Sequence, residues 1–345
     1  MELNKMNQDA DQLSKTGETR FQYKNRKQNI RKLIALTILI LLVCVLYLVI
    51  DLRFSNRKLM MFSLSLRIPK LVVMLITAFA IGASTIVFQS IVNNKIVTPA
   101  LLGMGDLYSL IHTVVFFFAG SASILAYNTN LSFIVDVVLM VVVASFIYGY
   151  LFQKTKFNTM FILLIGTVFG SLFGSLQNSI VRVMDPNEYD ALLGTLVASF
   201  ENINASIVLV SIILLALVAF VLRRDLILLD VITLGKDQAI NLGVDYNNVV
   251  RRLLMGVTIC VSISTAMVGP VTFLGLIVAN LSREFLKTYK HKFIITGAAL
   301  FGMLFLVGGQ LIVEHVFTYS VPVSVFISIS GGIYFLYLLI RQRSI

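Results

Sequence analysis

The chain has 345 residues, of which 58% are hydrophobic and 13% are charged. These proportions exclude a soluble helical bundle, because the helices of such a bundle keep a charged face toward water. We interpret the net charge of +11 as a signal of membrane topology and expect no nucleic-acid partner. The composition predicts an all-α polytopic membrane protein surrounded by membrane lipid.

The apolar stretches are taken in chain order. Residues 1–32 are predicted to form a cytoplasmic polar tail, too long and too mixed in charge for a signal peptide. Residues 33–50 contain no charged residue and are near the ~20 residues that cross a ~30 Å hydrocarbon core. About ten such helices are predicted, at residues 33–50, 71–88, 104–119, 132–152, 157–182, 205–222, 251–268, 271–282, 293–313 and 321–340. The third and eighth are short and are predicted to lie in protein beside irregular backbone.

The distribution of basic residues gives an orientation. With ten spans and a cytoplasmic N-terminus, 22 of the 28 Lys and Arg residues lie on the cytoplasmic side. Because cytoplasmic loops carry an excess of these residues, we expect a multi-pass protein of the cell membrane with both termini in the cytoplasm. Five of the six outer basic residues lie between Arg53 and Lys70, against the general trend.

Motifs for catalysis are missing. The sequence has no GxxxxGK[ST] loop, no HExxH motif and no paired cysteines. Its histidines, His112, His291 and His315, fall in different parts of the predicted topology, so we expect no metal site and no cofactor. An enzyme is therefore disfavoured.

Several ordered segments resemble the FecCD-type permeases, which are membrane subunits of ABC importers for ferric siderophores, haem and vitamin B12. The matching segments are RIPK at 67–70, Gln89, Asn94, PALLG at 99–103, LGKDQAINLGV at 234–244, GPVTFLGL at 269–276, PV at 322–323 and RQR at 341–343. The chain departs from the family pattern at Lys95, Leu192 and Ala279-Asn280. These departures leave the substrate open.

The resemblance implies a fold like that of the vitamin B12 importer permease, with a transmembrane permease domain over residues 33–345. It implies two partner ATPase subunits, an extracytoplasmic substrate-binding protein, expected to be a lipoprotein, and a second permease subunit, identical or related. A ferric siderophore is the first substrate class, with haem and vitamin B12 as alternatives. An ion-coupled secondary transporter would need an ion site at broken helices. A zinc or manganese importer would need a His/Asp/Glu constellation, which is not visible.

The resemblance also assigns docking residues. Arg67 and Lys70 correspond to outward-facing arginines that meet acidic residues on the binding protein. Charge complementarity there would steer docking more than it would add affinity. The alternative is that both side chains extend to lipid headgroups without a specific contact.

The family's ATPase contact corresponds to a coupling loop over about 223–252. Gly235 and Gly243 bracket a segment that suits two short helices. The coupling residues implied are Leu234, Gly235, Ala239, Leu242 and Gly243, where small residues would let the partner approach the backbone. An ordinary solvated loop is the alternative.

Four further residues are candidates for the gate and pathway. Asn94 and Thr159 correspond to gate residues of the vitamin B12 importer, although both types also suit helix ends. Gln177 and Asn178 either face a central pathway or bond a neighbouring helix. On the same predicted span, glycines at 166, 170 and 174 share one face, for which close helix packing is favoured over a widened pathway.

Overall fold

The computed structural model describes residues 20–50, 52, 57–154, 159–200, 204–317 and 321–342, and all regular structure within them is helical. The helices are α2 (Arg20–Val49), α3 (Arg57–Val92), η1 (Pro99–Leu102), α4 (Met104–Ala119), α5 (Ile124–Tyr127), α6 (Thr129–Lys154), α7 (Thr159–Val181), α8 (Pro186–Leu196), α9 (Ala205–Ile232), α10 (Lys236–Asn241), α11 (Tyr246–Val268), α12 (Leu274–Leu286), α13 (His291–His315) and α14 (Val323–Gln342).

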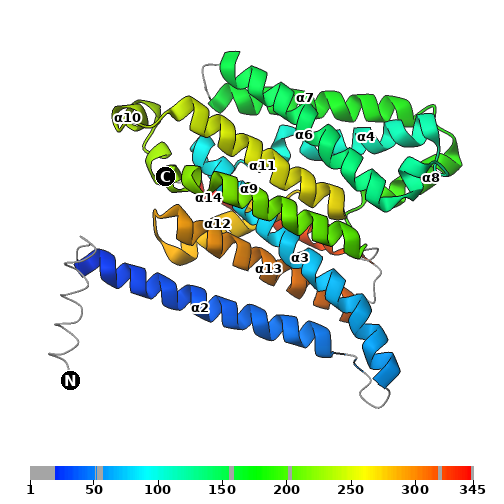
Figure 1. The fold of residues 1–345 in the computed structure, drawn as a ribbon, viewed down its shortest axis with the longest axis horizontal. Coiled ribbons are helices and arrows are strands. Elements are labelled where there is room, and N and C mark those ends of the chain that lie inside the picture. Colours follow the sequence, from blue (N-terminus) through cyan, green and yellow to red (C-terminus); the bar gives the residue numbers. More distant parts are fainter. Residues whose placement is uncertain are drawn as a thin grey trace.

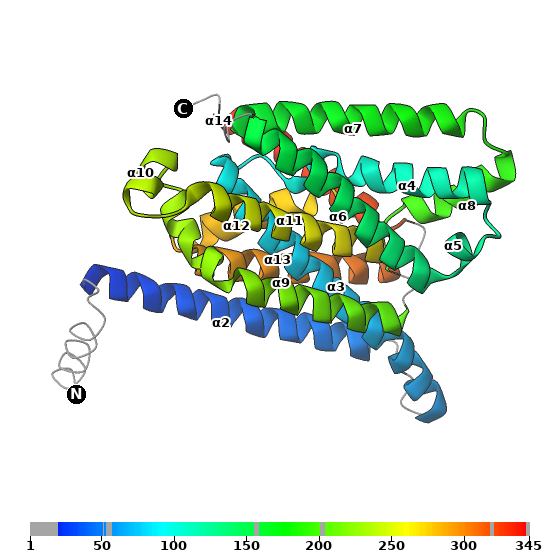
Figure 2. The same ribbon diagram turned by 45° about the horizontal axis from the view of Figure 1, so that its top comes forward.

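The long helices run roughly along one common direction and form a bundle (Figures 1 and 2). Helix α3 lies inside the bundle and packs most extensively against α13 and α11. One end of the bundle carries α10, the start of α2 and the chain's C-terminus, and we name it the α10 end. The opposite end carries α8 and the start of α3, and we name it the α8 end.

Seven helices within the described residues are long and apolar enough to cross a membrane. These spans are Asn25–Val49, Arg57–Val92, Thr129–Ile147, Leu164–Val181, Ser206–Ile232, Tyr246–Val268 and His291–His315. The helices at Met104–Ala119 and Val323–Tyr337 are apolar but shorter. Many large apolar side chains on these helices are exposed, which suits contact with lipid. The all-α, multi-pass membrane architecture is confirmed, while the number of ten spans stays a prediction.

Several helices extend beyond the predicted apolar stretches. Helix α2 begins at Arg20, so residues 20–32 are helical although we predicted a polar tail up to residue 32, and residues 1–19 lie outside the described residues. Helix α9 continues to Ile232 and α11 begins at Tyr246, which reduces the predicted 223–252 loop to residues 233–245. Polar residues such as Arg, Lys and Gln are good helix formers, so the helical backbone hydrogen bonds continue beyond the point where hydropathy falls.

The two short predicted spans are preceded by irregular backbone inside the protein, as expected. Helix α4 follows η1 and Gly103, and α12 follows the non-helical residues 269–273. Gly103 has a φ of 76°, and a Cβ there would lie 2.6 Å from the Cα of Gly170. Gly269 has a φ of 89°, and a Cβ there would lie 2.8 Å from the Cα of Ala198. Both turns therefore need glycine because of positive φ and close backbone approach.

Candidate functional site

The coupling segment, residues 233–245, holds one short helix rather than the two that we predicted. Gly235 precedes α10 with a φ of 106°. After α10, Gly243 with a φ of 83° donates its backbone N–H to the carbonyl of Ile240, and Val244 donates to that of Ala239. This pair of bonds is the Schellman arrangement, in which glycine ends a helix at positive φ. The two glycines therefore fix where the segment turns.

The coupling segment exposes apolar side chains at the α10 end. Leu234, Ile240 and Leu242 are 53%, 49% and 64% exposed. Clustered exposed apolar side chains outside the spans are typical of a protein contact. Ala239, which we predicted as a coupling residue, is fully buried and packs into the core with α9 and α11 residues. Its small side chain therefore fits the fold rather than a partner's surface.

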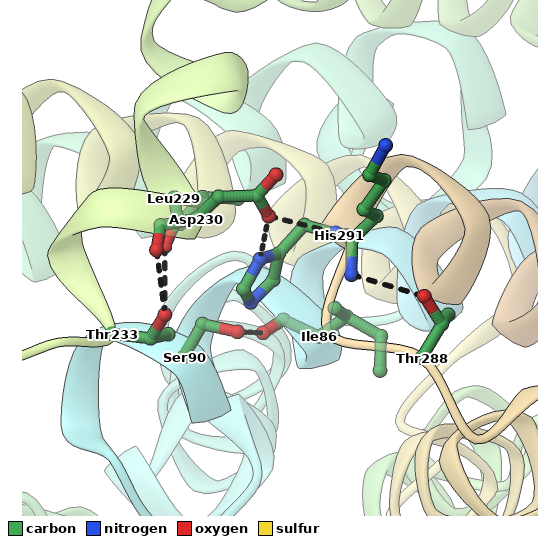
Figure 3. Close-up of polar contacts among 8 residues, drawn as sticks. Ile86, Ser90, Leu229, Asp230, Thr233, Thr288 and His291 are labelled. Atoms are coloured by element: carbon green, nitrogen blue, oxygen red, sulfur yellow. Dashed lines mark hydrogen bonds and ion pairs between the residues drawn. The ribbon is translucent and has the colours of Figure 1, made fainter. Parts of the chain in front are cut away.

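Two carboxylates near the end of α9 hold neighbouring helices. Asp225 accepts two hydrogen bonds from Arg252 of α11, from Nε at 2.8 Å and from a terminal nitrogen at 2.7 Å. Asp230 lies one turn farther along and accepts the backbone N–H of His291 at 2.9 Å and its ring Nδ1 at 2.5 Å (Figure 3). Because Lys290 gives α13 no side-chain cap, Asp230 acts as a cap supplied by another helix, and its negative charge suits a helix N-terminus.

The predicted gate residue Asn94 lies in a loop that we define as residues 93–98. Asn94 is exposed, and its side-chain oxygen accepts the backbone N–H of Ile96 at 2.9 Å. The carbonyl of Lys95 accepts hydrogen bonds from Gln89 at 2.7 Å and from Asn280 at 3.1 Å. The loop is therefore tied to both α3 and α12.

Thr159, the second predicted gate residue, is the first residue of α7, and its side chain lies outside the described part. The end of α3 and the start of α7 both lie toward the α10 end of the bundle (Figure 2). Hydrogen bonding within the 93–98 loop shows that Asn94 has a local turn-stabilising role. That role is compatible with a gate, because both need a fixed loop.

Helix α7 exposes a polar stripe beside an apolar one. Thr167, Ser171, Ser175 and Asn178 are exposed and recur every three or four residues, so they share one face. Leu164, Val168, Leu172 and Leu176 form the adjacent apolar stripe, each 46% to 61% exposed. Of the two predicted pathway residues, Asn178 belongs to the polar stripe and Gln177 is half-buried. The three hydroxyl residues were missed, although their four-residue period is visible in the sequence.

The opposite face of α7 packs closely on α4. A Cβ at Gly170 would lie 3.0 Å from Asp106 Oδ2, and one at Gly103 would lie 3.6 Å from the carbonyl of Gly166. Gly174 has open space at its Cβ position. Close packing is confirmed for the first two glycines of the predicted face, and this contact leaves the polar stripe pointing away from α4.

At the α8 end, Arg67 contacts the end of α2. One guanidinium nitrogen donates to the carbonyl of Tyr47 at 2.8 Å and to that of Ile50. Another lies 4.0 Å from Glu314 Oε2, and the side chains of Arg67 and Glu314 are only 15% and 3% exposed. Glu314 also accepts hydrogen bonds from Tyr47 and Gln310. We name Tyr47, Arg67, Gln310 and Glu314 the Arg67 cluster. Sequence reasoning missed Glu314 as the partner of Arg67.

Lys70 is half-buried one turn away, and its side chain makes no hydrogen bond or ion pair with any described residue. The start of α3 projects beyond the bundle (Figure 1), and its Leu59, Met61 and Phe62 are 45%, 58% and 63% exposed. Of the two predicted docking residues, only Lys70 therefore leaves its charge without a contact inside the described chain.

Comparison with known proteins identifies the family. The model of the FecCD transport family matches residues 28–341. The chain belongs to the FecCD transport family. It is 44% identical over 282 residues to the petrobactin import system permease protein YclO of Bacillus subtilis (strain 168), covering 82% of this chain and 90% of that one.

A second relative and a solved structure agree with this assignment. The petrobactin import system permease protein FatC of Bacillus anthracis is 37% identical over 282 residues, covering 81% of this chain and 79% of that one. A solved structure of a metal-chelate type ABC transporter in an inward-facing conformation matches with a TM-score of 0.77 and 21% identity, covering 90% of this chain and 99% of that one. The latter comparison supports the fold, and the expected family resemblance is confirmed.

Proposed function

We propose that this FecCD permease moves a ferric siderophore of the petrobactin type across the cytoplasmic membrane as one subunit of an ATP-driven importer. The relatives named as petrobactin import permeases, at 44% and 37% identity, carry the substrate assignment. Haem and vitamin B12 remain the alternative substrates. With the α10 end in the cytoplasm, both termini and most Lys and Arg residues lie inside, as the positive-inside rule requires.

The polar stripe of α7 supports a translocation pathway between two permease subunits, identical or related. Hydroxyl and amide groups facing hydrocarbon would lose hydrogen bonds to water, which makes such a face costly in lipid. A second subunit placed opposite Ser171, Ser175 and Asn178 would enclose a polar path instead. Gln177 lies beside this stripe and would add a polar side chain to the path near the α8 end.

The exposed leucines of the coupling segment support the ATPase contact. Leu234 and Leu242 would enter an apolar groove of the ATPase subunit, while Gly235 and Gly243 hold the turns that present them. The segment follows α9 directly, so movement of the ATPase would displace α9. Asn94 and Thr159 would form the cytoplasmic gate that responds to this displacement.

The outer face would receive the substrate-binding protein. Lys70 offers a positive charge to an acidic side chain of that partner, which would steer association. In this proposal Arg67 contributes to docking by holding α2 and α13 together beneath the docking surface. Its positive charge also adds to the electrostatic potential at that surface. The projecting start of α3 borders this surface.

Uptake of radiolabelled ferric petrobactin tests the proposal. Cells lacking the gene for this chain should lose ATP-dependent ferric petrobactin uptake and regain it when the gene is supplied, while uptake of radiolabelled vitamin B12 and haem stays unchanged. Normal petrobactin uptake in the deletion strain, with loss of either other substrate, would overturn the substrate assignment.

A second measurement tests the energy source. Uptake should stop when ATP is depleted and continue when an ionophore removes the ion gradients. The purified chain alone should hydrolyse no ATP above background, because its sequence has no phosphate-binding loop. Uptake that follows the ion gradient would instead favour a secondary transporter.

A further inference from the structure

The α10 end contains a connected set of polar contacts between the coupling segment and the 93–98 loop. It begins at Asp230, in the last turn of α9 just before the coupling segment. Figure 3 shows Asp230 facing His291 from across the gap between α9 and the start of α13, with Thr233 at the end of α9. The His291 side chain is 5% exposed and the Asp230 side chain 39%, so the histidine is enclosed by protein while the carboxylate reaches the surface.

The next step joins α13 to α12. The hydroxyl of Ser282 on α12 donates to the carbonyl of Ile294 on α13 at 2.7 Å. The two helices approach closely: a Cβ at Gly297 of α13 would lie 2.5 Å from Ser282 Oγ and 2.7 Å from Leu286 Cδ1 of α12. Packed helices at this distance move together, because interiors are dense and have few voids to absorb a shift. A displacement of His291 would therefore carry α12 with it.

The last step joins α12 to the 93–98 loop. A terminal nitrogen of Arg283 donates to Gln89 Oε1 at 3.2 Å, and Gln89 Nε2 donates to the carbonyl of Lys95 at 2.7 Å. The amide of Asn280 donates to the same carbonyl at 3.1 Å. Both amides from α3 and α12 thus converge on one atom, directly beside Asn94.

We propose that Asp230, His291, Arg283, Gln89 and Asn280 are positioning residues that transmit displacement of the coupling segment to the 93–98 loop. The proposal rests on the proposed function, because it assigns the residues that link the ATPase contact to the gate. Asp230 pulls on α13 through His291. Arg283 and Asn280 transfer that movement to Lys95 and so to Asn94.

The other carboxylate of α9 provides a matched control. Asp225 is the same residue type, lies one turn or so earlier and pairs with Arg252 at similar distances. Its partner Arg252 belongs to α11, a helix that contributes no residue to the series of contacts described above from Asp230 to Lys95. Losing this pair removes a comparable interaction without interrupting the proposed connection.

The test places a reporter cysteine on the loop of the complete transporter. Cys44 and Cys260 are replaced by alanine, and Lys95→Cys is added, because the Lys95 side chain is exposed and only its carbonyl holds the network. The complex with its ATPase and binding protein is reconstituted in liposomes. Labelling by a membrane-impermeant maleimide is then timed without nucleotide and in the ATP–vanadate trapped state.

We expect the labelling rate of the parent protein to change by about fivefold or more between the two states, the lower range for coupled sites. Asp230→Ala, His291→Phe and Gln89→Leu should each reduce this change to less than about twofold, while ATP hydrolysis persists and ferric petrobactin uptake falls. Asp225→Ala should keep the parent's response. Combining Asp230→Ala with Gln89→Leu should add little to either single effect, because both interrupt the same connection.

Copurification of the ATPase and a monodisperse gel-filtration peak show that each variant is assembled. If Asp230→Ala fails to fold, His291→Phe still tests the contact, because it keeps the hydrogen bond from the backbone of residue 291 to Asp230. A full nucleotide response in the three variants, equal loss in Asp225→Ala, or no response in a transporting parent would each overturn the proposal. Absence of ferric petrobactin uptake by the unmutated transporter would instead overturn the proposed function.

Discussion

The two ends of the bundle use charged side chains in different ways. At the α8 end, the Arg67 cluster closes on itself, because Arg67 satisfies carbonyls of α2 and faces the buried Glu314 of α13. At the α10 end, Asp230 and the groups beyond it form an open series of contacts that leads from the coupling segment to the 93–98 loop. A closed cluster fixes helices together, whereas an open series can carry displacement. The comparison predicts a static α8 end and a responsive α10 end.

The largest effect should come from breaking the Arg67 cluster. Arg67→Ala leaves Glu314 buried without its positive partner and is expected to lower the free energy of unfolding by about 3 kcal/mol, the lower range for broken buried pairs. Thermal unfolding in detergent measures this loss. Arg57→Ala, at an exposed position on the same helix, is the control and should leave the unfolding temperature unchanged. Equal stability of both variants would show that the Arg67 cluster does not fix the helices.

The next effect should appear at the coupling segment. Leu242→Glu places a charge where we propose an apolar ATPase groove, and losing burial of one leucine is worth about 1.5–3 kcal/mol. ATPase affinity measured by titration of the purified subunits should therefore fall at least about tenfold. Asn241→Glu, exposed on the same segment, should change it little. An unchanged affinity for Leu242→Glu would remove this surface from the proposed contact.

A smaller effect is expected for docking at the α8 end. Lys70→Glu should slow association with the binding protein by about tenfold at low salt, where the Debye length is ~30 Å. Arg57→Glu, farther along the projecting helix, should have a weaker effect. Arg67→Glu should also slow association more than Arg57→Glu does, but with loss of folded protein. Stopped-flow association rates separate these variants, and equal rates for Lys70→Glu and the parent would leave the outer basic residues as lipid headgroup contacts.

The smallest effect should come from the turns of the coupling segment. A Cβ at Gly243 would meet no atom within 4 Å, so Gly243→Ala acts only through its φ of 83°. We expect a loss of about 1 kcal/mol in stability, and a smaller loss for Gly243→Asn because asparagine tolerates this conformation better. Hydrogen exchange of the segment reports the difference. Equal exchange in both variants would mean that backbone conformation does not limit the segment's stability.

Much of the architecture could be predicted because the signals are local. The apolar stretches predicted a helical membrane protein, and the short stretches predicted irregular backbone before α4 and α12, where Gly103 and Gly269 have positive φ. The glycines at 235 and 243 predicted the turns around α10. Hydropathy placed the ends of α2 and α9 less well, because helices continue into water wherever the residues support them.

The partners of the charged residues could not be predicted. Arg67 and Glu314 lie on helices far apart in the sequence, as do Asp230 and His291, and no sequence period connects them. The direction of Ala239 also depended on how α10 packs against the core rather than on its small size. Such contacts follow from three-dimensional packing, which single-sequence patterns do not contain.

The sequence by itself determined that this protein is a helical membrane protein, because a segment that crosses lipid must be long and apolar and must satisfy its backbone hydrogen bonds internally. Its ordered motifs also determined the resemblance to a family of importer permeases. Only the tertiary structure decided which polar groups meet. In the folded chain Arg67 faces Glu314, the polar stripe of α7 is exposed, and Asp230 lies at the start of α13. The physical reason is that a buried polar group must find its partner in space, and that partner is chosen by how the helices pack.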